Sequence, residues 1–242
     1  MPLTAAALGT KLAAPVAIVP QGRPAYLTDA KAEWSLVPTV IVRKDWANVP
    51  ANVTNGISAS HAGAGSAGTT SMTIGGSLAS GGVATLPTGT DLTGRQLYGR
   101  NVVITVTHAT SVVAMSGTIT GKRLGRTVTE AWSVTATGTS KTFTGAVAFD
   151  TVSSITETVA ADASANTIIA GTGKVLGLVF KAASVKVIDD AEDGAAVTDG
   201  VIVKASSSAN ADARGTYTPN SSPNAALDFT VWYLCDDTTV IY

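Results

Sequence analysis

Apolar and hydroxyl-bearing residues alternate along this chain, most regularly between residues 127 and 137. The even positions there are Val128, Glu130, Trp132, Val134 and Ala136, and most odd positions are Thr or Ser. Successive side chains of a β-strand point to opposite faces of the sheet. The spacing therefore predicts a strand with one largely apolar face and one face rich in hydroxyl groups.

The same alternation recurs throughout residues 101–160. Apolar side chains share a parity in three further runs, namely Val102, Ile104 and Val106; Val113, Met115 and Ile119; and Phe143, Val147 and Phe149. Glycine-containing turns are predicted between residues 121 and 125 and near Gly138. Short alternating strands separated by such turns are typical of antiparallel all-β domains. We predict an all-β fold, with an antiparallel β-sandwich of Ig-like or jelly-roll-like type over residues 92–242.

The beginning of the chain has a different composition. Residues 1–50 hold six of the nine prolines, and frequent Pro disfavours long helices and central strands. The same residues include many apolar side chains, which disordered tails usually lack. We predict an extended, Pro-rich N-terminal arm over residues 1–50 that docks on the later domain or on another subunit. Its best short strand is TVIVR, ending at Arg43.

Residues 51–91 are rich in Gly, Ser and Thr. This composition suits either a linker or a small β-segment, and the sequence leaves both readings open.

Charge is scarce along the whole chain. The 242 residues have a net charge of −1, and charged residues make up 14%, against about 25% in an ordinary soluble domain. A nucleic-acid-binding protein usually has a basic excess or a basic cluster of some size, so we expect no nucleic-acid partner. Two explanations for an uncharged surface remain open. The protein is either a secreted β-protein coated with Thr and Ser, or a protein whose surface is covered by neighbouring subunits.

The single cysteine and the first residues bear on where the protein is made. Cys235 has no second cysteine to pair with, and it shares the parity of Phe229 and Val231, which predicts a small buried residue. The N-terminal run lacks the basic region of a signal peptide and is interrupted by Pro15. No apolar run is long enough to span a membrane. We expect synthesis in a cytoplasm and no membrane partner.

Neither histidine lies in a recognisable catalytic or metal-binding motif. His61 and His108 are far apart in the sequence, and no H-E-x-x-H, C-x-x-C or G-x-S-x-G pattern is present. We interpret His61 as a solvated loop residue and place His108 at the end of a strand. The glycines fit no phosphate-binding loop.

Glu130 is the most unusual acidic residue, because it shares the apolar parity of Val128 and Trp132. Burying a carboxylate is costly unless it is paired. We therefore predict an ion pair between Glu130 and Arg126 or Lys141, at a sheet edge or a subunit contact.

Two clusters of like charge remain. The basic cluster, Lys122, Arg123 and Arg126, is predicted to be a solvated turn, or else a contact with an acidic neighbour. The acidic cluster comprises Asp189, Asp190, Glu192, Asp193 and Asp199. Its spacing does not fit an EF-hand loop, so we interpret it as a solvated turn. The sequence assigns no catalytic, cofactor-binding or metal-binding residue, and we expect no cofactor and no enzymatic activity.

One stretch resembles a module of virion structural proteins of tailed bacteriophages. That module reads roughly G-T-x-x-x-G-x-x-V-T-E, a Gly/Thr-rich turn, A-F-x-T-V-x-S-I-T and a final G-T-G. The matching residues are Gly117, Thr118, Gly125, Val128, Thr129, Glu130, Ala148, Phe149, Thr151, Val152, Ser154, Ile155, Thr156 and 171–173. The C-terminal ARGTYTPNSSPNAALDFTVWY also looks like the end of such proteins, so the resemblance covers about residues 95–235. The usual D-x-x-G turn is KRLG here.

This resemblance implies a head decoration, or cement, protein that covers joints between subunits of the major capsid protein. It implies assembly in a bacterial cytoplasm, a place on the virion surface and no catalytic residue. We expect a homo-oligomer, a trimer on capsid three-fold axes. The alternatives are another virion component, such as a tail, fibre or receptor-binding protein, and then a secreted adhesin or a polysaccharide-active enzyme.

Overall fold

The computed structural model describes residues 39–197, 200–203 and 215–236. Within these ranges the chain forms strands and turns without a helix, and all the paired strands are antiparallel, which confirms the predicted all-β architecture. The described part therefore contains no helix that is long and apolar enough to cross a membrane. Most of the predicted arm, residues 1–38, lies outside the described ranges, and so does Asp199 of the acidic cluster.

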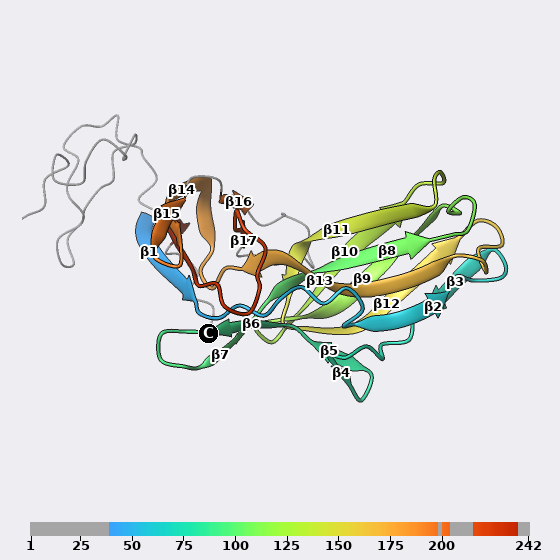
Figure 1. The fold of residues 1–242 in the computed structure, drawn as a ribbon, viewed down its shortest axis with the longest axis horizontal. Helices are drawn as coiled ribbons and strands as arrows, with labels where there is room; N and C mark the ends of the chain where they lie inside the picture. Colours follow the sequence, from blue (N-terminus) through green and yellow to red (C-terminus); the bar gives the residue numbers. More distant parts are fainter. Residues whose placement is uncertain (1–38, 198–199, 204–214, 237–242) are drawn as a thin grey trace, which may run out of the picture.

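The first of two six-stranded sheets, here called the β9 sheet, has the order β10–β9–β12–β5–β4, with β3 also paired to β12 (Figure 1). Its strands are β3 (Gly68–Ser71), β4 (Ala79–Ser80), β5 (Val83–Thr85), β9 (Met115–Arg123), β10 (Arg126–Val134) and β12 (Thr151–Val159). The strand predicted from the most regular alternation is β10.

The second six-stranded sheet, here called the β8 sheet, has the order β11–β8–β13–β17–β16, with β2 also paired to β13. Its strands are β2 (Ser58–Ala62), β8 (Arg100–Thr107), β11 (Ser140–Phe149), β13 (Thr167–Gly177), β16 (Val201–Val203) and β17 (Thr216–Thr218).

A third sheet of four strands joins the two ends of the described chain, and we call it the terminal sheet. Its order is β1–β18–β14–β15, and its strands are β1 (Thr39–Trp46), β14 (Ala182–Glu192), β15 (Ala195–Val197) and β18 (Phe229–Asp236). A separate hairpin is formed by β6 (Pro87–Thr90) and β7 (Gln96–Tyr98). The predicted TVIVR strand is the first part of β1.

The β9 and β8 sheets enclose the larger of two hydrophobic cores, and the strands around it form the large lobe. The predicted inward residues of β8, Val102, Ile104 and Val106, are fully buried and share this core with Ile119 of β9 and Ile155 of β12. The alternation along the sequence therefore identified the buried face of each of these strands correctly.

The second core lies between the terminal sheet and the ends of the β8 sheet, and the elements around it form the small lobe. It is rich in aromatic residues, and the rings of Trp46 and Tyr217 stack with their centroids 5.8 Å apart. From β18 it takes Phe229, Val231, Tyr233 and Cys235. The prediction that Cys235 is a small buried residue is confirmed.

Strand β13 belongs to both lobes. Its first half contributes Ile168 and Ala170 to the core of the large lobe, and its second half contributes Leu176 to the core of the small lobe. Between these halves the pairing of β13 with β8 shifts register, between Thr172 and Leu176. This irregularity is the junction of the two lobes.

Candidate functional site: buried charges at the seams of the fold

Arg123 lies at the junction of the two lobes rather than in solvent, which corrects the prediction for the basic cluster. The hairpin after it is a tight two-residue turn at Leu124 and Gly125, whose φ angles of 46° and 79° are both positive, as the hairpin turn of type I′ requires. Strand β9 consequently runs on through Arg123, on the same inward parity as Ile119, and the side chain is only 2% exposed.

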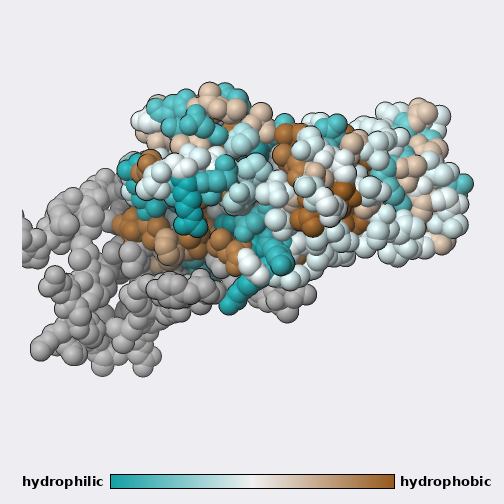
Figure 2. Space-filling model, turned by 90° about the horizontal axis from the view of Figure 1, so that it is seen from below, coloured by the Kyte–Doolittle hydropathy of each residue, from teal (hydrophilic) through white to brown (hydrophobic). Residues whose placement is uncertain are grey.

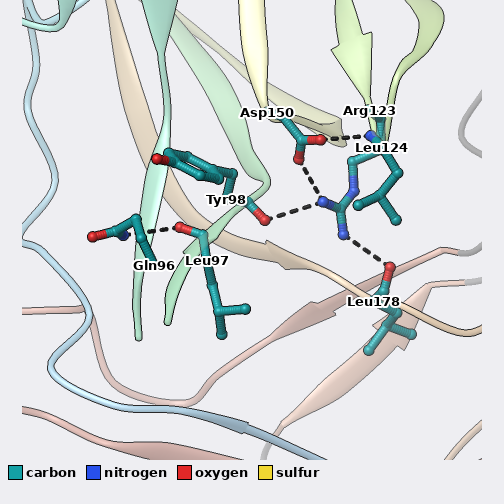
Figure 3. A network of polar contacts seen from close by, with 7 residues as sticks. All are labelled: Gln96, Leu97, Tyr98, Arg123, Leu124, Asp150 and Leu178. Carbon is teal, nitrogen blue, oxygen red and sulfur yellow. Dashed lines mark hydrogen bonds and ion pairs between the residues drawn. The ribbon is translucent and has the colours of Figure 1, made fainter. Parts of the chain in front are cut away.

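The Arg123 guanidinium connects three separate segments (Figure 3). Its Nη1 donates to Asp150 Oδ1 at 2.5 Å and to the carbonyl oxygen of Tyr98 at 3.0 Å. Its Nη2 donates to the carbonyl oxygen of Leu178 at 2.9 Å. A Cβ added to Gly99 or Gly177 would lie 2.6 Å from one of these nitrogens, so both positions need glycine to make room for the guanidinium.

Arg100, at the start of β8, holds the irregular part of β13. The side chain is 1% exposed, and its Nε and Nη2 donate to the carbonyl oxygen of Gly173 at 3.0 and 2.7 Å. Nη1 donates to the carbonyl oxygen of Pro50 at 2.6 Å, and Nη2 also donates to Asn52 Oδ1. These acceptors are neutral oxygens, and burial lowers the pKa of Arg100 to about 10, which still leaves it protonated at neutral pH.

The neighbouring Asn101 completes the hydrogen bonding that β13 loses at its register shift. Its Oδ1 accepts from the backbone N–H of Val175 at 3.0 Å, and its Nδ2 donates to the carbonyl oxygen of Gly145 at 2.7 Å. Buried backbone groups must find a partner. Arg100 and Asn101 supply side-chain partners where the ladder is interrupted, which fixes the passage of β13 from one lobe to the other.

Glu130 forms no ion pair with Arg126 or Lys141 within the described residues, so that prediction is wrong. Instead its Oε1 accepts from the backbone N–H groups of Ala146 and Val147, at 2.6 and 3.1 Å. These residues lie where β11 shifts register against β8. Burial raises the pKa of Glu130, and the two backbone hydrogen bonds partly oppose this. The carboxylate thus joins the edges of the two large sheets through backbone donors.

His61 is half-buried on β2, and the expectation of a solvated loop residue is wrong. Its Nε2 lies 3.3 Å from Oε1 of Glu157, a fully buried residue of β12. Thr70 of β3 donates to the same oxygen at 2.8 Å. Because β2 belongs to the β8 sheet whereas β12 and β3 belong to the β9 sheet, this contact closes the opposite seam of the sandwich.

The contacts of the two histidines are local or structural. The Thr70 hydroxyl donates to the Glu157 carboxylate that contacts His61. His108 Nδ1 accepts from the backbone N–H groups of Thr110 and Ser111, at 2.9 and 3.0 Å, and lies 3.2 Å from the Thr110 hydroxyl oxygen. These contacts of His108 all lie within three residues of it and close a turn.

Two residues of the acidic cluster, Asp190 and Glu192, are packed into the small lobe, which corrects the prediction of a solvated turn for them, whereas Asp189 and Asp193 are exposed. Asp190 is buried, and its Oδ2 accepts from the Tyr217 hydroxyl at 3.1 Å and from the Gly200 N–H at 3.0 Å. Burial raises the pKa of Asp190, and these hydrogen bonds oppose the effect. Glu192 accepts from the Ser221 N–H at 2.8 Å. The described residues contain no group of three or more His, Cys, Asp or Glu side chains suited to a metal ion.

Among the charged residues at these seams, Glu130 is the one for which we predict a buried contact from its position in the sequence. Arg100, Arg123 and Glu157 carry the same signal, a charged residue on the apolar parity of its strand. All of them bind backbone groups or neighbouring side chains at seams between sheets or lobes, which is a structural role.

No family model, curated protein or solved structure matches this chain.

Proposed function

We propose that this protein is a non-enzymatic structural component of a tailed-bacteriophage virion, a decoration or cement protein that binds the major capsid protein on the head surface. The support from the sequence is the ordered resemblance over residues 117–173 and the scarcity of charge. The buried charges bind backbone groups and neighbouring side chains of the fold itself.

The outer face of the β9 sheet is the observation that carries this proposal. The register places Ser133, Ser116, Thr158 and Thr69 in one row across four strands. A second row runs through Thr129, Thr120 and Ser154. Lys122, at one end of β9, is the single charged residue among the outward positions of β9, β10, β12 and β3.

Such a face suits close contact with another protein. Burying a charge in an interface is expensive, and cores of interfaces are depleted of charged residues. Hydroxyl groups hydrogen-bond to backbone groups of a partner and carry little desolvation cost by comparison. Figure 2 shows pale colours of near-neutral hydropathy over the end of the large lobe that is farthest from the small lobe.

The direct test is the number of copies in particles. Virions purified from cells that produce this chain are separated on a stained gel, and its band is compared with that of the major capsid protein. A decoration protein is present in hundreds of copies per particle, and imaging places it as trimers on the head. A handful of copies indicates a tail or fibre protein, and absence from purified particles contradicts the proposal.

A further inference from the structure

The outer face of the terminal sheet carries a small group of apolar residues close to the start of β1. Along β18, Phe229, Val231, Tyr233 and Cys235 point into the small-lobe core. The opposite parity presents Trp232 and Leu234, both half-buried, and the register places Ile41 of β1 beside Leu234. Ile41, Trp232 and Leu234 belong to neither hydrophobic core, and we call them the outer cluster.

This outer cluster departs from the pattern of the large sheets. On β10 the outward positions include Thr127, Thr129 and Ser133, as expected of an antiparallel sheet with one face in water. Three large apolar side chains in the equivalent place on the terminal sheet indicate that something covers them.

Polar residues border the outer cluster. The Arg43 guanidinium lies over the Trp232 ring, 5.0 Å from its centroid, and its Nη2 is 2.8 Å from Asp45 Oδ1. Thr230 donates to the same oxygen of Asp45 at 2.7 Å. The register places the exposed Asp189 of β14 beside Trp232, and it pairs Thr39 with Asp236 beyond Ile41 and Leu234. The outer cluster is therefore a small apolar area close to the start of β1.

The chain itself supplies an apolar segment at that end. Thirty-eight residues precede Thr39, and they include Val16, Ile18, Leu27, Trp34 and Leu36. At about 3.3 Å per residue, an extended segment of this length reaches any part of the terminal sheet, in the same molecule or in a neighbour. Removing the apolar side chains of this segment from water lowers the free energy of the protein.

We propose that the outer cluster of Ile41, Trp232 and Leu234 is the docking site for residues 1–38 of this chain. The apolar residues of that segment pack on the cluster, and the Arg43–Asp45 pair marks the limit of the site. The proposal does not depend on the virion function, because it concerns how the chain covers its own exposed face.

Hydrogen–deuterium exchange on the full-length chain tests this docking. In the wild type, amides around Trp34 and Leu36 exchange more slowly than in a random coil. The double substitution Ile41→Thr and Leu234→Thr, which places β-branched, strand-favouring residues at both positions, lowers that protection at least about tenfold. The matched control, Val83→Thr, exchanges an exposed apolar residue on β5 of the large lobe and leaves the protection unchanged.

Protection of the β1 and β18 amides in the same data shows whether the terminal sheet stays folded, and Ile41→Thr alone serves as a milder variant. Sedimentation of the same samples shows whether a second copy of the chain, rather than residues 1–38, covers the outer cluster. The proposal is supported if residues 1–38 are protected in the wild type and lose this protection in the substituted variants. This holds whether the segment docks within a monomer or on a neighbouring copy in an oligomer. Coil-like exchange of residues 1–38 in the wild type overturns it, and so does a dimer that the substitutions dissociate while residues 1–38 stay unprotected.

Discussion

The two lobes differ in the side chains that fill their hydrophobic cores. The core of the large lobe is dominated by aliphatic residues. Most of its strand pairings, such as β8 with β13 and β12 with β3, join strands that are not consecutive in the chain. The small lobe joins β1 to β18, which are separated by most of the described chain, around the stacked rings of Trp46 and Tyr217. Local alternation of residues therefore indicates which face of a strand is buried, whereas the pairing of strands depends in both lobes on contacts between distant segments.

The outer surfaces of the lobes differ as well. The β9 sheet presents rows of hydroxyl groups, whereas the terminal sheet presents Ile41, Trp232 and Leu234. Among the described residues, eight large hydrophobic side chains are well exposed, and six of them lie in the small lobe or in the segments that border it, namely Leu92, Tyr98, Phe180, Val185, Val201 and Val203. Our two proposals accordingly give the large lobe polar contacts and the small lobe apolar docking.

The largest expected effect comes from breaking the link between the lobes. Arg123→Met leaves Asp150 without its cation and the carbonyl groups of Tyr98 and Leu178 without their donor. Removing one partner of a buried ion pair costs about 3–5 kcal/mol, measured as the free energy of unfolding in denaturant. Arg126→Met, at an exposed position of β10, is the control and changes stability by about 0.5 kcal/mol or less. Equal stability of the two variants would show that the link contributes nothing.

A cavity in the shared strand tests whether the lobes unfold together. Leu176→Ala truncates a fully buried residue of β13 in the small-lobe core and destabilises the fold by about 3 kcal/mol. Because β13 also pairs with β8 in the large lobe, amides of β8 and β18 both lose protection from hydrogen exchange. Loss of protection confined to β18 would mean that the lobes are independent folding units.

A smaller effect concerns the pH dependence of the large lobe. Because burial raises the pKa of Glu130, the folded state binds its proton more tightly than the unfolded state does. The stabilising contribution of the protonated carboxyl is present at low pH and is lost as the pH rises through the raised pKa. Glu130→Gln removes this loss, so the variant gains stability relative to the wild type as the pH rises above the ordinary pKa of a Glu carboxyl and through the raised pKa of Glu130.

The exposed Asp91 supplies a control of opposite sign. Hydrogen bonds from Thr93 and Arg95 lower the pKa of Asp91, so Asp91→Asn loses stability relative to the wild type as the pH rises. Denaturant unfolding at several pH values checks both variants. A difference between Glu130→Gln and the wild type that does not change with pH would contradict the role of burial at Glu130.

The sequence alone predicts the large-lobe strands between residues 100 and 160, because apolar residues such as Val102, Ile104 and Val106 recur there at every second position. It leaves open whether residues 51–91 form strands, and the structure places β2, β3, β4 and β5 of the large lobe there. The sequence also predicts the burial of Cys235. It does not predict that Arg123 is buried, because a two-residue turn and a four-residue turn at the KRLG sequence place that side chain differently. The contacts of His61 with Glu157 and of Asp190 with Tyr217 join distant segments, and no local pattern specifies them.

The charged residues on apolar parity were nevertheless visible. Arg100 precedes Val102 by two positions and Glu157 lies between Ile155 and Val159, so each has the same signal as Glu130. A charge at such a position indicates a buried contact with backbone or side-chain groups, and the partner then has to come from the structure.

The central claim is that the protein acts by covering another protein with its uncharged outer face. The most direct measurement is the binding of the purified full-length chain, and of its Thr129→Lys and Thr129→Glu variants, to phage heads that lack it. Ala165→Lys, in an exposed loop, is the control. We predict saturation at hundreds of copies for the wild type and the control, and at least about tenfold weaker binding for both Thr129 variants, because a charge of either sign must be desolvated. Failure of the wild type to bind heads, or unaltered binding by both Thr129 variants, would contradict the account.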